Sequence, residues 1–197
     1  MNLAVFDFDG TLTNRDTLFE FLKFYQGPFG YYFRLFILVP VFALYALKII
    51  PNWKAKQMVL ILFFKGAPLG EFQNKCNEFA DKVIPGLIRS DARSKLSEHL
   101  NKNHRVVVIS ASPENWIKPW CDKMGIEYIA TKLNTFEGAL TGRISGRNCY
   151  GPEKVNRLKD YLNPGDFEMI YAYGDSKGDR ELLALADKGY YKLFVGN

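Results

Sequence analysis

Three short apolar runs, each followed within two residues by an acidic or hydroxyl-bearing residue, constrain the fold of this chain more than any other feature. The runs are 3–8, 105–109 and 169–173, and their β-branched and aromatic content predicts buried strands. The second and third are followed by helix-like sequence at 113–124 and 178–187. Because strands that alternate with helices form mostly parallel sheets through right-handed crossovers, the sequence predicts an α/β fold with a doubly wound, Rossmann-like sheet.

Residues 15–90 separate the first strand from the second and show no strand-like alternation. Several helical stretches there are interrupted by Gly27-Pro28, Pro51, Pro68 and Pro85-Gly86. We therefore expect a helical cap at 15–90, inserted into a core made of 1–14 and 91–197. Within the predicted core, Glu137-Gly138 lies between two short alternating stretches and predicts a hairpin over 135–144.

Composition excludes several classes of protein. A chain of 197 residues that is 48% hydrophobic can bury a core without disulfides and is not disordered. Its three cysteines are odd in number and widely spaced, which argues against a disulfide framework or a thiolate zinc site. A reducing compartment fits this pattern, and the start of the chain does not resemble an export signal. We therefore expect a cytoplasmic protein.

The net charge of +5 is concentrated in the predicted cap. Residues 15–65 hold seven basic and two acidic residues, so the rest of the chain is neutral. The same segment holds 14 of the 30 aromatic residues. Because its basic residues alternate with aliphatic ones and form no tract, we expect no nucleic-acid partner.

Acidic and polar residues follow each predicted strand. Asp7 and Asp9 follow the first, Ser110 the second, and Asp175 and Asp179 the third. Lys154 lies just after Pro152, which is placed to begin a helix. Ligands of such sheets bind at the carboxyl ends of the strands, so these side chains are expected to converge there.

Three carboxylates brought together without histidine or cysteine suit a hard cation, most simply Mg²⁺, which is a common partner of phosphate oxygens. Lys154 and Ser110 add the fixed cation and the hydroxyl that a phosphoryl group needs. One aspartate of the first pair can attack phosphorus, and the other can protonate the leaving alcohol and activate water. Each acid alone is better explained as a turn or cap residue, but a D-x-D-G-T motif arises by chance in about one such chain in a thousand.

Four stretches resemble the haloacid dehalogenase-like superfamily, and within it the phosphoserine-phosphatase-like subfamily (IB), which carries a helical cap after the first motif. They are DFDGTLT (7–13), VVVISAS (106–112), GPEKV (151–155) and YGDSKGDRELL (173–183). The resemblance implies a Mg²⁺-dependent phosphatase that forms an aspartyl phosphate.

The resemblance also implies roles for individual residues. Asp7 is the implied nucleophile, Asp9 the general acid and base, and Ser110 and Lys154 the groups that bind the phosphoryl group. The implied metal ligands are Asp7, the backbone carbonyl of Asp9, Asp175 and, in support, Asp179. The remaining implied substrate-binding residues are Gly10, Thr11, Asp16, Ala111 and Ser112.

The substrate-recognition positions depart from those of phosphoserine phosphatases. Asp16 stands where these enzymes have a glutamate, residues 50–66 offer lysines in place of an arginine, and Ala111-Ser112 replace a Gly-Gly pair. Phosphoserine is therefore a disfavoured substrate. The apolar, basic cap resembles that of haloacid dehalogenase-type phosphatidylglycerophosphatases, which implies a lipid phosphate. A small soluble ester such as phosphoserine is the first alternative, and a non-catalytic, membrane-associated binding protein is the second.

Residues 35–47 are apolar, without a charge, and bounded by Arg34 and Lys48. At 13 residues the run is short for a membrane span, which needs about 20. Three interpretations stay open: the interior of the cap, an attachment to an anionic membrane on its inner face, and a homodimer contact. His99 and His104 are expected to be exposed to solvent.

Overall fold

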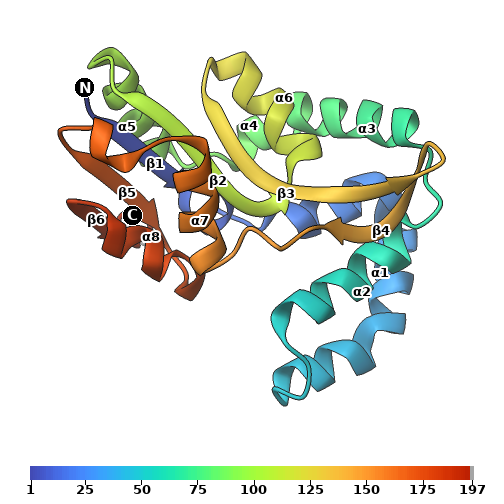
Figure 1. Ribbon diagram of the computed structural model, residues 1–197. Helices are drawn as coiled ribbons and strands as arrows, with labels where there is room; N and C mark the ends of the chain where they lie inside the picture. Colours follow the sequence, from blue (N-terminus) through green and yellow to red (C-terminus); the bar gives the residue numbers. More distant parts are fainter. Residues whose placement is uncertain (196–197) are drawn as a thin grey trace.

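The computed structural model describes residues 1–195 and is built around a six-stranded sheet (Figure 1). The strand order is β4-β3-β2-β1-β5-β6. Every neighbouring pair is parallel except β3 and β4, which form an antiparallel hairpin. The strands are β1 (Leu3–Asp7), β2 (Arg105–Pro113), β3 (Glu127–Phe136), β4 (Ala139–Ser145), β5 (Ile170–Gly174) and β6 (Lys188–Tyr191). The predicted doubly wound α/β core is confirmed.

Strand β1 occupies the centre of the sheet and is buried along its whole length. Because both of its faces are covered, its sequence is continuously apolar up to Asp7. In the register of the sheet Asp7 lies opposite Ile109, and Phe6 lies opposite Tyr173. The residues that follow these three strands therefore meet at one edge of the sheet.

Helices cover both faces of the sheet (Figure 1). On one face α7 and α8 bury Leu158 and Leu182 against Val5 and Val107. On the other face α5 and α6, together with the base of the cap, pack around Phe6. These helices are α5 (Ser90–Asn101), α6 (Glu114–Met124), α7 (Pro152–Tyr161) and α8 (Arg180–Leu185).

The predicted cap is helical. It contains α1 (Thr17–Ala46), α2 (Asn52–Phe64), α3 (Leu69–Lys82) and α4 (Ile84–Leu87). Helix α1 is bent at Gly27, whose φ of 71° is not helical, and α2 runs back beside it. The pair projects away from the sheet as a helical hairpin (Figure 1). The boundaries 15–90 and 91–197 stay predictions, and residues 196–197 lie outside the described residues.

The β3–β4 hairpin reaches the cap, a contact that the sequence did not predict. Its turn is the predicted Glu137-Gly138 pair, with φ of 48° and 76°. The amide of Gly66 donates to the Leu140 carbonyl at 2.8 Å, and the Leu140 amide donates to the Ala67 carbonyl at 2.9 Å. The far half of the hairpin is thus bonded to the segment between α2 and α3.

The expectation that His99 is exposed was wrong, because only 3% of the residue is accessible to solvent. Its Nε2 lies 2.8 Å from the Tyr173 hydroxyl, and its Nδ1 lies 2.8 Å from Nδ1 of His104. Burial lowers the pKa of His99 to about 4, and the neighbouring His104 acts in the same direction. His99 is therefore a neutral core residue at neutral pH.

Candidate active site

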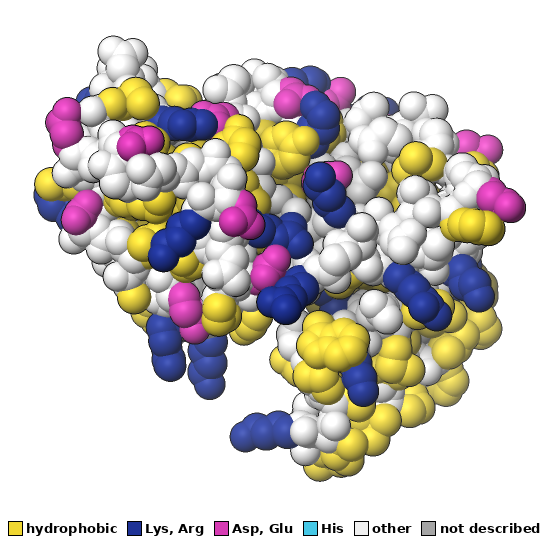
Figure 2. Space-filling view, in the orientation of Figure 1, with side chains coloured by type: hydrophobic (Ala, Val, Ile, Leu, Met, Phe, Trp, Pro, Cys, Tyr) yellow, Lys and Arg dark blue, Asp and Glu magenta, His cyan; other side chains and the backbone are white. Residues whose placement is uncertain are grey.

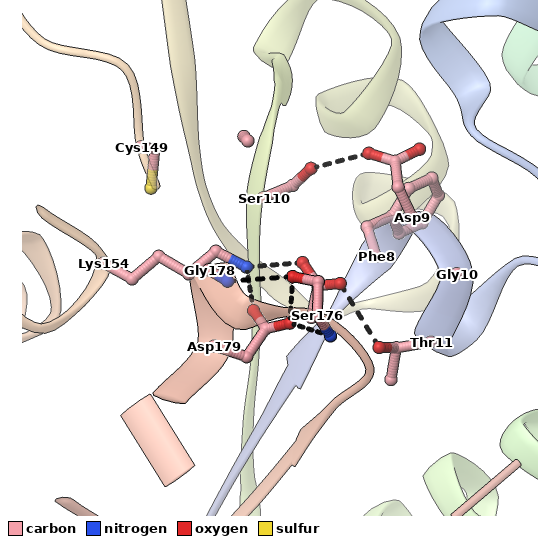
Figure 3. Close-up of polar contacts among 12 residues, drawn as sticks. Phe8, Asp9, Gly10, Thr11, Ser110, Cys149, Lys154, Ser176, Gly178 and Asp179 are labelled. Atoms are coloured by element: carbon pink, nitrogen blue, oxygen red, sulfur yellow. Dashed lines mark hydrogen bonds and ion pairs between the residues drawn. The ribbon is translucent and has the colours of Figure 1, made fainter. Parts of the chain in front are cut away.

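A buried lysine between two carboxylates forms the floor of the site (Figure 3). Lys154 Nζ donates to Asp7 Oδ1 at 2.5 Å and to Asp179 Oδ1 at 2.6 Å. The side chains of these three residues are at most 7% exposed. Lys154 lies in the first turn of α7, where Pro152 begins the helix after Gly151, whose φ is 62°. The fold thus places a fixed positive charge beside the end of β1.

Asp179 is held rigidly by the loop that follows β5. Its Oδ2 accepts hydrogen bonds from the Asp175 amide at 3.2 Å, the Ser176 amide at 3.0 Å and the Ser176 hydroxyl at 2.8 Å. A Cβ at Gly174 would collide with the Asp179 side chain, so this packing requires glycine there. Asp179 therefore orients Lys154 and shapes the loop that carries Asp175.

Asp7 and Asp175 share a single hydroxyl donor. Thr11 Oγ1 lies 3.2 Å from Asp7 Oδ2 and 3.2 Å from Asp175 Oδ1, and its one proton can serve only one of them at a time. A Cβ at Gly10, which has a φ of 82°, would clash with Asp175. Gly10 and Thr11 thus form a sharp bend that leaves room for a second carboxylate beside Asp7.

The charges of this cluster fit a bound cation. Oxygens of Asp7, Asp175 and Asp179 lie within 4.8 Å of one another, and one ammonium group contacts them among the described residues. Burial raises the pKa of Asp7 to about 8, because the opposing effect of Lys154 is outweighed. Burial and the charge of Asp179 also raise the pKa of Asp175. Carboxylate oxygens that outnumber the positive charges beside them form a suitable site for a hard divalent ion.

Asp9 lies in a different environment from Asp7, although only one residue separates them. One oxygen of Asp9 accepts from the Thr17 amide at 2.7 Å and the Thr17 hydroxyl at 2.5 Å. The other accepts from the hydroxyls of Ser112 at 2.7 Å and Ser110 at 3.2 Å. Asp9 is thus held by neutral donors from the cap and from β2, whereas Asp7 is held by an ion pair.

A cavity of about 690 Å³ lies over these groups. Its floor includes Asp7, Asp9, Lys154 and Asp175, and its walls include residues of α1 and α2. From α2, Lys56 Nζ reaches down and donates to the Ala111 carbonyl at 2.6 Å. Burial lowers the pKa of Lys56, while Asp9 and Asp16 oppose that effect. The cap therefore brings a second lysine to the site.

Asp16 stands at the wall of the same cavity and caps α1, accepting from the Leu18 amide at 2.9 Å. Burial and the nearby Asp9 raise its pKa to about 6, against the effect of Lys56. The structure thus places all of the predicted site residues at this edge of the sheet. Those residues are Asp7, Asp9, Gly10, Thr11, Asp16, Ser110, Ala111, Ser112, Lys154, Asp175 and Asp179.

Sequence reasoning missed four residues of the site. Thr17 follows the predicted Asp16, and its place at the start of a helix could have indicated a donor to Asp9. Ser176 lies inside the fourth motif, residues 173–183, and supports Asp179. Lys56 is one of the lysines noted in residues 50–66, but the sequence does not single it out. Asn148 carries no signal in the sequence, because it comes within 3.4 Å of Lys56 only when α2 is placed over the sheet.

Comparison with known proteins identifies the family. A model of the haloacid dehalogenase-like hydrolases matches residues 4–184. The chain belongs to this family. The matched range contains every residue of the acidic cluster described above.

Relatives of the hydrolase include proteins named as phosphatases. The protein CicA of Caulobacter vibrioides is 35% identical over 196 residues, 98% of this chain and 87% of that protein. A histidinol-phosphatase of Neisseria meningitidis serogroup C is 31% identical over 140 residues, 64% of this chain and 63% of that protein. The family match and the relative named as a phosphatase place the hydrolase among the phosphatases of its family.

Solved structures share the fold. A protein of unknown function from Bordetella pertussis superposes with a TM-score of 0.80 at 25% identity, covering 96% of this chain and 88% of that one. A phosphoserine phosphatase, solved as an analogue of its phospho-aspartyl intermediate, superposes with a TM-score of 0.67 at 20% identity, covering 96% and 84%. The core and the helical cap of the hydrolase therefore follow an arrangement shared with phosphoserine phosphatases.

Proposed function

We propose that this phosphatase hydrolyses phosphate monoesters through an aspartyl phosphate formed on Asp7, with Mg²⁺ as its cofactor. The observation that carries the proposal is the pair of contrasting aspartates at the cavity floor. Asp7 is ion-paired to the fixed cation Lys154, and Asp9 is held by hydroxyl and amide donors. Two carboxylates in different environments can take the two different roles that this chemistry needs.

In the first half-reaction an oxygen of Asp7 attacks phosphorus, and the bond between phosphorus and the ester oxygen breaks. The protonated carboxyl of Asp9 gives its proton to that ester oxygen, which leaves as an alcohol. Lys154 offsets the negative charge on Asp7 and on the phosphoryl oxygens. Ser110 Oγ, 3.2 Å from Asp9, is placed to donate to a phosphoryl oxygen once substrate enters.

In the second half-reaction the Asp9 carboxylate takes a proton from water, and the resulting hydroxide attacks phosphorus. The bond between phosphorus and the Asp7 oxygen breaks, which releases inorganic phosphate and restores both carboxyl groups. Thr17 positions Asp9 for both steps, since it holds one carboxylate oxygen through two hydrogen bonds.

Asp7 and Asp175, with Asp179 in support and the backbone carbonyl of Asp9, are the groups that would hold Mg²⁺. When bound, the ion offsets charge on the phosphoryl oxygens and on the clustered carboxylates. The raised pKa values of Asp7 and Asp175 support this assignment, because they indicate a cluster short of positive charge.

An amphiphilic phosphate monoester, such as phosphatidylglycerophosphate, is the proposed substrate. The cavity joins a charged floor to an apolar wall formed by Phe19, Phe42, Tyr45 and Val59 of the cap. Lys56 lies between the charged floor and the apolar wall, where its Nζ donates to the Ala111 carbonyl. A lipid phosphate would place its monoester on the floor, a second anionic group near Lys56 and its chains along the apolar wall.

The proposal is tested by measuring phosphate release, with and without Mg²⁺, from phosphatidylglycerophosphate in mixed micelles, glycerol 3-phosphate and phosphoserine. Glycerol 3-phosphate carries the same kind of monoester without the chains. We expect release from the lipid to exceed release from both soluble esters, and to require Mg²⁺. Asp7→Asn should abolish release, while Asp160→Asn, an exposed aspartate on α7, should leave it unchanged.

Three outcomes would contradict parts of the proposal. Equal or faster hydrolysis of phosphoserine would refute the lipid substrate but leave the chemistry standing. Release that persists in Asp7→Asn would refute the covalent mechanism. No release from any ester, with no phosphorylated protein detected by mass spectrometry, would instead favour a non-catalytic binding protein.

A further inference from the structure

The cap carries an unusual concentration of exposed apolar side chains. Of the 22 exposed large apolar side chains found among residues 1–195, 12 lie between Phe29 and Met58. The most exposed are Phe29 at 87%, Phe36 at 75% and Leu47 at 70%. Soluble proteins rarely leave a contiguous apolar area of this kind uncovered unless it binds something. We call the following residues the apolar cap face: Phe29, Tyr32, Phe33, Phe36, Val39, Leu47, Ile49 and Trp53.

The geometry of α1 explains why this face is open. Beyond Gly27 the helix packs its inner side, with Leu38 and Val41 buried, towards α2. Arg34 on that side lies over the ring of Phe63 at 5.5 Å. Phe29, Phe33 and Phe36 recur at helical spacing on the outer side, where an ordinary surface helix would carry polar residues.

Charge on the same part of the cap is of one sign. Residues 21–70 contain six basic residues and no acidic one. Lys48 and Lys54 flank the tip of the α1–α2 hairpin, next to Leu47 and Trp53. Figure 2 shows the projecting lobe as mainly apolar, with basic side chains and no acidic ones on the visible face. Apolar residues beside basic ones are complementary to an anionic lipid surface.

The helical hairpin that carries the apolar cap face also borders the active-site cavity. Phe42, Tyr45 and Asn52 of the same helical hairpin line the cavity that holds Asp7. One side of this hairpin thus borders the cavity, while its outer side carries the apolar cap face.

The structure favours docking at the membrane surface over spanning. Helix α1 is long and apolar enough to cross a membrane by length and composition. Its first turns, however, belong to the core: Thr17 bonds to Asp9, and Phe21 stacks on Trp116 with ring centroids 4.6 Å apart. The part beyond Gly27 is about 28 Å long, but it ends at the charged tip and pairs with α2 along its inner side.

We infer that the apolar cap face inserts into the interface of an anionic phospholipid bilayer, with Lys48 and Lys54 at the lipid headgroups. This docking surface goes beyond the proposed catalysis and does not depend on it. A protein inactivated at Asp7 therefore binds the same membrane.

Trp53 provides a test. It is 49% exposed, whereas Trp116 and Trp120 are at most 7% exposed, so vesicle contact changes mainly the emission of Trp53. The full chain is titrated with vesicles of phosphatidylcholine alone or mixed with phosphatidylglycerol, and binding is measured by flotation. We expect a blue shift and flotation with the anionic vesicles, weakened by high salt, and quenching by lipids brominated near the headgroup.

Variants separate the apolar and the charged contributions. Phe33→Ser/Phe36→Ser should abolish flotation, while Phe136→Ser, which removes an equally exposed phenylalanine from the β3–β4 hairpin, should not. Lys48→Ala/Lys54→Ala should weaken binding more than tenfold, since each lysine near an anionic surface contributes about fivefold. Lys159→Ala on α7 serves as its control. Asp7→Asn should bind like the wild type.

Three results would overturn the inference. One is a protein that stays unbound at low salt on anionic vesicles. Another is quenching only by bromines deep in the acyl region, which would indicate a spanning helix. The third is a dimer in solution that dissociates in Phe33→Ser/Phe36→Ser and does not float, which would assign the apolar cap face to a second copy of the chain.

Discussion

Replacing Lys154 by methionine tests whether the ion pair at the cavity floor has the strength that its geometry implies. The ammonium lies 2.5 and 2.6 Å from carboxylate oxygens of Asp7 and Asp179 and is almost fully buried. At an effective dielectric constant of about 20, each contact is worth roughly 6 kcal/mol of Coulomb attraction. Desolvation of the three ions opposes most of this sum.

The net change in stability depends on the charges that remain after Lys154 is replaced. Without the ammonium, two buried carboxylates lose their counter-charge, and Asp175 lies close by. Removing one partner of a buried ion pair typically costs ~3–5 kcal/mol. We therefore expect Lys154→Met to lower the free energy of unfolding by ~3–5 kcal/mol in Mg²⁺-free buffer at pH 7.5, measured by urea denaturation. In assays with Mg²⁺ present, the same substitution should abolish phosphate release.

A second substitution distinguishes lost charge from lost packing. Lys154→Met/Asp7→Asn should be more stable than Lys154→Met by ~1–3 kcal/mol, because one uncompensated charge has been removed. Lys159→Met, on the exposed side of the same helix, should change stability by less than about 0.5 kcal/mol. A loss below about 1 kcal/mol in Lys154→Met, or no recovery in the double variant, would refute this reasoning.

Three further predictions concern the surroundings of the site. Thr17→Val removes a hydroxyl donor from Asp9, so kcat should fall at least about tenfold while Thr17→Ser retains most of it; equal activity in both would exclude the positioning role. The pKa of His99 is lowered from 6.5 to about 4, so between pH 4 and pH 6.5 the unfolded state binds more protons than the folded state. The free energy of unfolding should therefore fall by ~1–3 kcal/mol as the pH drops from 7 to 4. The urea midpoint of His99→Gln should depend less on pH than that of the wild type. Gly142→Ala should destabilise by ~1–3 kcal/mol, because its Cβ would approach the α2 backbone to 2.5 Å. Gly146 has the same φ of 72°, but a Cβ there would contact nothing. Equal losses of stability in Gly142→Ala and Gly146→Ala, measured by calorimetry, would show that backbone strain and not the contact with α2 causes the loss.

The core of the fold was predictable because its signals are local. A strand buried on both faces, such as Leu3–Asp7, must be apolar throughout, and its motif residues must follow where the strand ends. The convergence of Asp7, Lys154 and Asp175 then follows from parallel strands that share one edge. The turn at Glu137 was predictable for the same reason, since it is specified by two adjacent residues.

What could not be predicted depends on elements that meet only in three dimensions. Lys56 reaches Ala111 because α2 lies over the sheet, which no spacing in the sequence encodes. The orientation of Asp9 depends on Thr17 at the start of the cap. The burial of His99 could not be predicted, because its hydrogen-bond partner Tyr173 lies 74 residues further along the chain.

The bond between the β3–β4 hairpin and the cap determines how the cavity can open. Residues of β3 up to Thr131 pair with β2, and those from Lys132 onwards pair with β4. The far half of the hairpin is attached to the cap through backbone hydrogen bonds at Gly66 and Ala67. A cap that lifted alone would break these bonds, whereas a cap that moves with the hairpin bends β3 near Thr131. A cap movement that keeps these bonds therefore has to deform the middle of a strand, which should make it slower than a movement hinged in loops alone.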